Sequence, residues 1–386
     1  MWKSIASNGF NLLLLLVLLI GALAVWGKQQ YYTEGPLARA ICLEVDRGAT
    51  MRSLSQTLYE KNAIASSAIF RIGAEYTNKT GDLKAGNFLL GQAISMADIT
   101  EIITKGGANT CGQEVIYRIG VSSTQVQVRE MDPATARFEE KLSFNLEQNV
   151  PKAFAEVLQE LGIRHRLAIA EGVTSFKIVE ALNAIDLLSG EILEVPPEGM
   201  LAPGSFEIRQ GDDREALLIK MKAMQEAILN EAWDQRADYL PLASKEDALI
   251  LASIIEKETG QADERGLVAS VFVNRLRQGM PLQTDPAVIY GLTLGRKSLG
   301  RGLRRSELDR DTPWNTYVNK GLPETPIANP GHQSILAALL PTESDFLYFV
   351  ADGTGGHAFS VTYSEHLRNV AEWRKIEKER KNPQSN

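Results

Sequence analysis

An apolar run near the amino terminus sets the strongest limit on how this chain can fold. Residues Phe10–Trp26 contain a single polar side chain and are bordered by Lys3 and Lys28. A run of about 17 residues is short for a helix that crosses a bilayer, and Ala22–Ala24 is typical of a signal-peptide cleavage site. Because the apolar run continues past that site, we predict an uncleaved anchor with the amino terminus inside and the remaining chain outside the cytoplasm.

The amino-acid composition is typical of a globular protein. The 386 residues are 44% hydrophobic and 23% charged, which is enough for two or three domains. The formal net charge of −7 argues against nucleic acid as a partner and gives no electrostatic reason for binding anionic lipid. Any membrane attachment should therefore be hydrophobic.

Only two cysteines are present, Cys42 and Cys111. Outside the cytoplasm an even pair favours a disulfide, here one that ties together the ends of the first soluble region. Two separate buried thiols are the alternative.

The most informative soluble stretch runs from 244 to 290 and indicates two helices followed by an extended arm. Ser244 with Asp247 three positions later is typical of a capping box, and apolar residues then recur at helical spacing through Ile255. This predicted helix ends on two carboxylates, Glu256 and Glu258.

Helical spacing distinguishes the two carboxylates. Glu258 shares its face with Leu251, Ile254 and Ile255, whereas Glu256 follows Ser253 and Ala252. An apolar face and a helix carboxyl end both disfavour the charged carboxylate, so the pKa of Glu258 should rise, as a general acid requires. The alternative is that both residues belong to a solvated helix end.

Several motifs in fixed order resemble those of the endolytic murein transglycosylase family, also called the YceG-like family. They are IIEKET, NRL, LQTDPAVIYG, NTY, GLP, PIANPG and LYFVADGTGGHAFS. The resemblance is close from Glu171 to Val370 and looser over Leu43 to Gly107. It implies that Glu258 is the catalytic acid and base and that Thr259 is the hydroxyl residue following it.

The expected fold class is α+β, with a helical active-site core and a carboxyl-terminal hairpin in the catalytic domain. A strand-helix-helix-strand order after the anchor resembles a LysM domain, which would bind N-acetylglucosamine chains; a plain spacer domain is the alternative. The predicted parts are 1–36 (cytoplasmic tip, transmembrane anchor and polar linker), 37–108 (LysM-like module), 109–166 (insertion of unknown role) and 167–386 (catalytic domain).

Polar side chains in and around the predicted loops are the candidates for binding substrate. They are Thr259, Gln283, Thr284, Asp285, Tyr290, Asn315, Thr316, Tyr317, Asn329 and His357. Asp285 before Pro286 is also how a helix begins, with the Asp as cap, and His357 could orient a carboxylate or be a satisfied turn histidine, which we favour. Gly204 and Phe206 stand where the family has Asp and Tyr, which argues against a catalytic role for that loop.

The resemblance implies an inner-membrane lytic transglycosylase that faces the periplasm and cleaves between N-acetylmuramic acid and N-acetylglucosamine. Such an enzyme leaves 1,6-anhydro ends, trims or terminates nascent strands and works beside penicillin-binding proteins. We expect no metal and no cofactor. A lysozyme-type hydrolase with Asp285 as second carboxylate, and a non-enzymatic wall-binding scaffold, are the alternatives.

Overall fold

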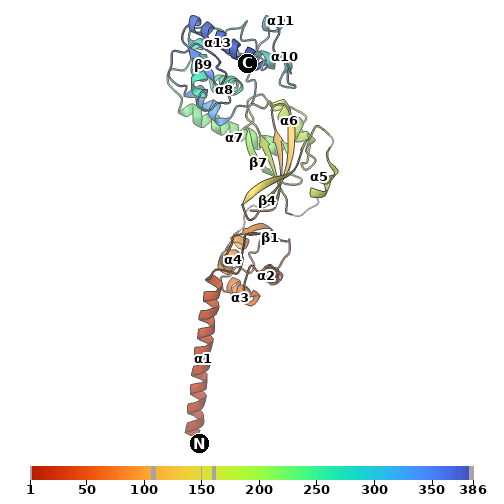
Figure 1. The fold of residues 1–386 in the computed structure, drawn as a ribbon, viewed down its shortest axis with the longest axis vertical. Helices are drawn as coiled ribbons and strands as arrows, with labels where there is room; N and C mark the ends of the chain where they lie inside the picture. Colours follow the sequence, from red (N-terminus) through yellow and green to blue (C-terminus); the bar gives the residue numbers. More distant parts are fainter. Residues whose placement is uncertain (1, 106–109, 149, 159–161, 382–386) are drawn as a thin grey trace. The chain divides into compact units, whose positions relative to one another are not determined.

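The computed structural model describes residues 2–105, 110–148, 150–158 and 162–381. Its contacts divide the chain into two compact units (Figure 1). The first unit comprises Met1–Val115, Gln127–Ser143 and Pro151–Arg164, and the second comprises Ile116–Val126, Phe144–Val150 and His165–Asn386. The predicted boundary at 108 and the tail beyond 381 lie outside the described residues.

The amino-terminal part of the first unit has the predicted element order. Its elements are α1 (Trp2–Tyr32), β1 (Ile41–Val45), α2 (Met51–Glu60), α3 (Ser67–Tyr76), β2 (Gly86–Leu90) and α4 (Met96–Lys105). Strands β1 and β2 pair antiparallel, and Thr50 starts α2 with a reciprocal capping box. Leu43, Leu58 and Phe70 are fully buried, so the helices and the two strands enclose one core.

The predicted disulfide is confirmed: Cys42 in β1 is bonded to Cys111, with a Cα–Cα distance of 5.8 Å. The bond closes a loop with a sequence separation of 69 residues. Cross-links that close long loops lower the entropy of the unfolded chain, by about 4 kcal/mol for a loop of this length. The bond therefore stabilises the first unit mainly by restricting its unfolded state.

We expect the double variant Cys42→Ala, Cys111→Ala to lower the opening free energy of the first unit by about 4 kcal/mol. Hydrogen exchange of the β1 and β2 amides in the full-length protein would measure this change. Reductant should destabilise the natural protein and leave the variant unchanged. Equal protection in the two proteins would contradict the prediction.

Helix α1 is long and apolar enough over Leu12–Tyr32 to cross a membrane, a property that signal sequences share. The sequence predicted a polar linker from Gln29 to Ala38, but its first residues, Gln29–Tyr32, belong to α1. The helix continues to Tyr32, Tyr31 is 4% exposed within the first core, and Leu37 is buried beside it. Tyr31 Oη also donates to Thr100 Oγ1 at 2.8 Å, so α1 runs directly into the folded unit.

A five-stranded sheet contains the segment predicted as an insertion. Its order is β5-β4-β3-β6-β7, formed by β3 (Gln113–Ile119), β4 (Thr124–Asp132), β5 (Arg137–Asn145), β6 (Arg164–Ile169) and β7 (Gly204–Ile208). Alternation in the sequence predicts strands over Gln125–Arg129 and near Leu142–Leu146, and these fall on β4 and β5, whereas β3 was missed. The sequence also predicts a helix from Pro151 to Leu161; the observed helix α5 covers Lys152–Val157, and residues 159–161 lie outside the described residues.

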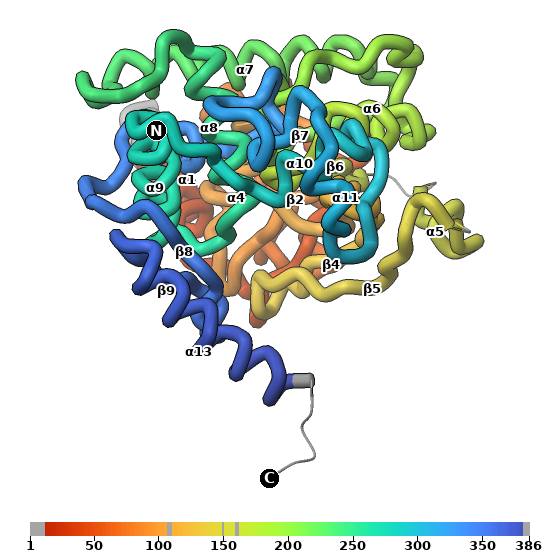
Figure 2. The backbone as a smooth tube through the Cα atoms, turned by 90° about the horizontal axis from the view of Figure 1, so that it is seen from above, coloured from red at the N-terminus to blue at the C-terminus, as the bar shows by residue number. Residues whose placement is uncertain are grey.

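Helices dominate the remainder of the second unit (Figure 2). They are α6 (Ser175–Ala184), α7 (Arg214–Asp234), α8 (Lys245–Glu258), α9 (Arg265–Arg277), α10 (Asp285–Thr293), α11 (Arg305–Leu308), α12 (His332–Leu339) and α13 (Tyr363–Lys381). Strands β8 (Tyr348–Ala351) and β9 (His357–Ser360) pair antiparallel. The many Pro and Gly residues from Trp314 to Gly331 predict a loop, and the chain from 309 to 331 indeed contains no helix or strand.

Helix α8 is the centre of this unit. Every residue from Ala248 to Ile255 is buried, and α8 contacts α7, α9, α10 and α12. A helix that is apolar on all sides must be enclosed by other elements. Its carboxyl end is therefore held in place from several directions, and Glu258 is its last residue.

Candidate active site

The end of α8 fixes the position of Glu258. Ser244 and Asp247 form the predicted capping box at the start of the helix, and Thr259 leaves the helix in an extended conformation. Thr259 is buried, and its Oγ1 accepts a hydrogen bond from the Gln261 backbone at 3.0 Å. The Thr259 hydroxyl thus shapes the turn immediately after Glu258.

Burial raises the pKa of the Glu258 carboxyl, and the negative charge of Asp285 raises it further. The nearby Thr284 hydroxyl, His357 and Arg275 act in the opposite direction and lower it. Glu258 is half-buried, so part of its surface remains accessible. The group is therefore a carboxyl that holds its proton to a higher pH than a free one and can still reach a ligand.

The start of α10 brings Thr284 and Asp285 to Glu258. Thr284, not Asp285, occupies the N-cap position, and no side chain caps this helix. The interpretation of Asp285 as a helix cap is therefore wrong: its Oδ1 instead accepts a hydrogen bond from Tyr317 Oη at 2.7 Å. Thr284 Oγ1 is buried without a hydrogen bond of acceptable geometry, although it lies close enough to lower the pKa of Glu258.

The loop before α12 holds the start of α10 in place. Thr316 Oγ1 accepts from the Thr284 backbone at 3.0 Å, and the Gln283 backbone N–H donates to the Thr316 carbonyl at 3.0 Å. Gln283 has a φ of 52° and an exposed side chain. Burial and the charges of Asp285 and Glu258 raise the pKa of Tyr317, so its hydroxyl stays protonated and donates.

His357 forms a pair with a carboxylate that the sequence did not single out. Its Nδ1 lies 2.7 Å from Glu264 Oε2, and its backbone N–H donates to Glu264 Oε1 at 2.8 Å. This pair fits both interpretations of His357: the ring is satisfied after the turn, and it also contacts a carboxylate. His357 in addition lowers the pKa of Glu258.

Arg275 is a buried cation that contributes to the same electrostatic environment. Its guanidinium donates to the Leu347 carbonyl at 2.7 Å and to the Leu282 carbonyl at 2.7 Å, and it lies over the Tyr348 ring. Arg275 therefore ties the end of α9 to β8 and to the arm before α10. The charge also lowers the pKa of Glu258.

Glu256 has a different role from Glu258. Its Oε2 accepts from the Gly331 backbone at 3.0 Å and from Ser334 Oγ at 2.7 Å. Both donors belong to the first turn of α12, where a negative charge is favourable. Glu256 thus joins α8 to α12 and stabilises the scaffold.

Two side-chain amides that were predicted to bind substrate are hydrogen-bonded to the protein's own backbone. The Asn315 amide is buried and bonds to backbone groups of its own loop, including the Leu308 carbonyl at 2.9 Å. Asn329 is 0% exposed; it accepts from the Leu201 backbone at 2.9 Å and donates to the Val173 carbonyl at 3.0 Å. Both side chains hold loops together in this structure.

Tyr290 is hydrogen-bonded to a second carboxyl group, that of Glu198, which the sequence analysis did not single out as a candidate. Tyr290 Oη donates to Glu198 Oε2 at 3.2 Å, and Glu198 Oε1 accepts from the Ser175 backbone at 2.7 Å. Burial raises the pKa of Glu198 despite these bonds. Glu198 begins the stretch 198–207, which the sequence analysis set aside because Gly204 and Phe206 differ from the family's residues. The Glu198-Gly199 pair was the signal that could have identified it.

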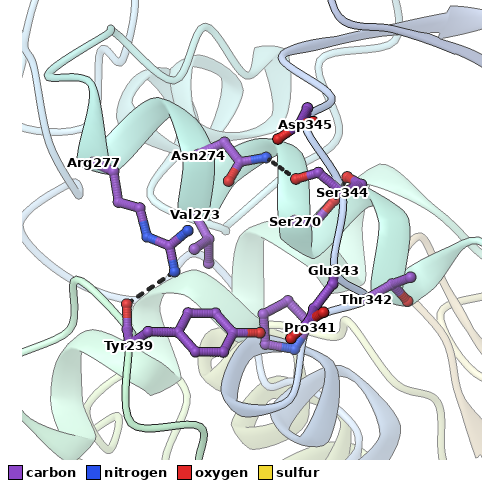
Figure 3. A pocket seen from close by; sticks show the side chains of 10 residues that line it. All are labelled: Tyr239, Ser270, Val273, Asn274, Arg277, Pro341, Thr342, Glu343, Ser344 and Asp345. Atoms are coloured by element: carbon purple, nitrogen blue, oxygen red, sulfur yellow. Dashed lines mark hydrogen bonds between the residues drawn. The ribbon is translucent and has the colours of Figure 1, made fainter.

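A cavity of about 540 Å³ lies between α9 and the segment 341–345 (Figure 3). Ser270, Val273, Asn274 and Arg277 line one side, and the segment 341–345 lines the other. Asn274 donates to the Ser344 carbonyl at 2.8 Å, and Arg277 donates to the Tyr239 carbonyl at 2.9 Å. Glu258 is not among the lining residues, so this cavity is separate from the cluster around Glu258.

Comparisons with known proteins agree on one family. The sequence pattern of the YceG-like family matches residues 43–372. A Streptococcus pneumoniae serotype 2 (strain D39 / NCTC 7466) protein named endolytic murein transglycosylase is 29% identical over 346 residues, covering 86% of this chain and 58% of its own length. A Bacillus subtilis (strain 168) protein with the same name is 28% identical over 351 residues, covering 90% and 89%.

This chain thus spans 58% of the length of the pneumococcal relative. A crystal structure of a YceG-like protein from Listeria monocytogenes aligns with a TM-score of 0.46 and 25% identity. The alignment covers 86% of this chain and 98% of that one.

Proposed function

The chain belongs to the YceG-like family, and from that membership and the setting of Glu258 we propose that it is a peptidoglycan lytic transglycosylase. The observation that carries the proposal is a carboxyl group with a raised pKa at the end of a buried helix, where the family motif places its acid and base. The names of the two curated relatives support murein as the substrate.

In the proposed mechanism, Glu258 serves as acid and then as base. The protonated carboxyl gives its proton to the glycosidic oxygen between N-acetylmuramic acid and N-acetylglucosamine as that bond breaks. The carboxylate then removes the proton from the muramyl 6-hydroxyl, whose oxygen bonds to the anomeric carbon and closes the 1,6-anhydro ring. One carboxyl group suffices because the internal hydroxyl replaces the water that hydrolysing enzymes activate.

The neighbours of Glu258 suit both halves of this cycle. Asp285 favours the protonated acid before cleavage, whereas Arg275 and His357 stabilise the carboxylate that follows. The Thr284 hydroxyl can donate to that carboxylate, which would satisfy its own unpaired oxygen. The exposed Gln283 and the Tyr317 hydroxyl are the predicted side chains best placed to contact sugar.

We further propose that α1 anchors the enzyme in the inner membrane and that the folded units face the periplasm. The disulfide agrees with an oxidising compartment. Trimming or termination of nascent strands beside penicillin-binding proteins would suit an enzyme held at that surface.

Product analysis on purified sacculi tests the activity. The full-length enzyme should release fragments that end in 1,6-anhydro-muramic acid, each lighter by one water molecule than the hydrolysed equivalent. Protein carrying Glu258→Gln is the control. Reducing ends would show a hydrolase, and undigested sacculi would favour the wall-binding scaffold.

The variant Asp285→Asn separates the transglycosylase from a two-carboxylate hydrolase. Asn keeps an acceptor for Tyr317 but removes the charge that raises the pKa of Glu258. That pKa should fall, so less Glu258 is protonated at a given pH, and the alkaline limb of the pH–rate profile should move to lower pH. An activity loss as severe as that of Glu258→Gln would instead assign Asp285 a direct catalytic role.

A further inference from the structure

One face of α3 exposes apolar side chains to solvent. Ala68, Ile72 and Tyr76 follow one another at four-residue spacing, and Ile72 and Tyr76 are 66% and 85% exposed. The opposite face carries Phe70 and Ala74, which are fully buried in the first core. The exposed stripe is therefore not needed to close that core.

Helix α3, which carries this stripe, packs against the end of α1 (Figure 1). The Tyr31 ring packs so closely on Gly73 that a Cβ at position 73 would overlap it. Tyr32, the last residue of α1, is 57% exposed, and its ring contacts that of Tyr31 edge to face. Helix α3, which packs on Tyr31 through Gly73, and the end of α1 thus both carry exposed apolar or aromatic side chains: Ile72, Tyr76 and Tyr32.

The helix geometry sets the depth of this point. If the apolar run ends at Trp26, then Tyr31 lies five residues further along α1, about 7.5 Å above the edge of the hydrocarbon. The headgroup region on each side of a bilayer is of similar thickness. Gly73, which the Tyr31 ring contacts, is therefore level with the headgroups.

We propose that the face formed by Tyr32, Ala68, Ile72 and Tyr76, here called the α3 interfacial face, lies in the headgroup region of the bilayer that α1 spans. The inference rests on the proposed anchor. Tyrosines with an apolar ring and a polar tip favour this layer, and a helix can bury an apolar face there. The occupant is lipid and not protein because α1 brings the face to the membrane surface without a linker.

Spin labels on the full-length protein in phosphatidylethanolamine and phosphatidylglycerol vesicles test the proposal. Both natural cysteines are in the disulfide, so an introduced cysteine is the single free thiol. Labels at Tyr76→Cys and Ile72→Cys should show raised accessibility to oxygen and reduced accessibility to a water-soluble nickel complex. Leu19→Cys is the lipid reference, and Arg47→Cys, exposed after β1, is the water reference.

The references separate two kinds of failure. If Leu19 reports lipid while positions 72 and 76 match Arg47, then the α3 interfacial face is wrong and the anchor stands. If Leu19 itself reports water, then the anchor is wrong and the inference fails with it. Interfacial values at both positions, with Leu19 in lipid and Arg47 in water, would support the proposal.

Discussion

Replacing Glu258 with Gln should reduce glycan cleavage by on the order of a thousandfold or more and leave the fold intact. Gln preserves the shape of the side chain but cannot exchange a proton with the glycosidic oxygen. The loss should therefore appear in kcat, measured as the rate of release of anhydro fragments from sacculi. Thermal unfolding of the same preparation would show whether the fold persists.

The stability of this variant should also depend on pH in a defined way. The pKa of Glu258 is raised in the folded state, so the folded protein binds its proton more tightly than the unfolded chain does. Its stabilising contribution is complete at acid pH and is lost as the pH rises through the folded pKa. Glu258→Gln should remove this loss and equal or exceed the natural protein in stability at alkaline pH.

Glu256→Gln is the matched control, two residues away on the same helix. It should retain cleavage and lose about 1 kcal/mol of unfolding free energy, because a charge that faces the first turn of α12 is replaced by a neutral amide. Full activity with Glu258→Gln and loss with Glu256→Gln would assign catalysis to the other carboxylate. Full activity with both variants would assign catalysis to another acid.

The second large effect should come from Asn329→Ala, and it should be a loss of stability. Asn329 is fully buried and bonds to Leu201, Val173, Ser175 and Glu198, which joins three separate segments. Truncation leaves several buried polar groups unpaired and should lower the unfolding free energy by about 3 kcal/mol. Hydrogen exchange of the α8 and α12 amides at increasing denaturant concentration would measure this loss of unfolding free energy.

Asn319→Ala is the control for this variant. Asn319 is exposed, and its amide donates to the Thr312 carbonyl at 2.9 Å, so its loss should change stability by about 0.5 kcal/mol or less. If Asn329→Ala kept full stability but raised KM, Asn329 would instead contact the glycan. That result would restore the role predicted from the sequence.

The sequence predicted the features that depend on local spacing. The capping box at Ser244, the apolar run of α8 and the end of that helix at Glu258 follow from helical periodicity, and the same periodicity distinguishes Glu258 from Glu256. The disulfide followed from the number of cysteines and the expected compartment.

Features that depend on distant partners could not be predicted in this way. Asn315 and Asn329 are polar residues in a loop, which also describes ligand-binding side chains; only the folded loop shows that their amides are occupied. Asp285 before Pro286 has the local signature of a cap, yet Tyr317, 32 residues away, takes its carboxylate. Tyr31 joined the first core because Gly73 leaves room for its ring, and no local pattern indicates that contact.

If α1 anchors the protein in a membrane as proposed, its direct passage into the first unit has a mechanical consequence. An apolar run of about 17 residues spans about 25 Å, somewhat less than a typical hydrocarbon core, and such a helix stays near the bilayer normal or thins the membrane around it. Because Tyr31 packs on Gly73 and bonds to Thr100, α1 and the first unit should tilt together as one rigid body. The local thickness of the membrane would therefore influence the angle between the first unit and the membrane plane.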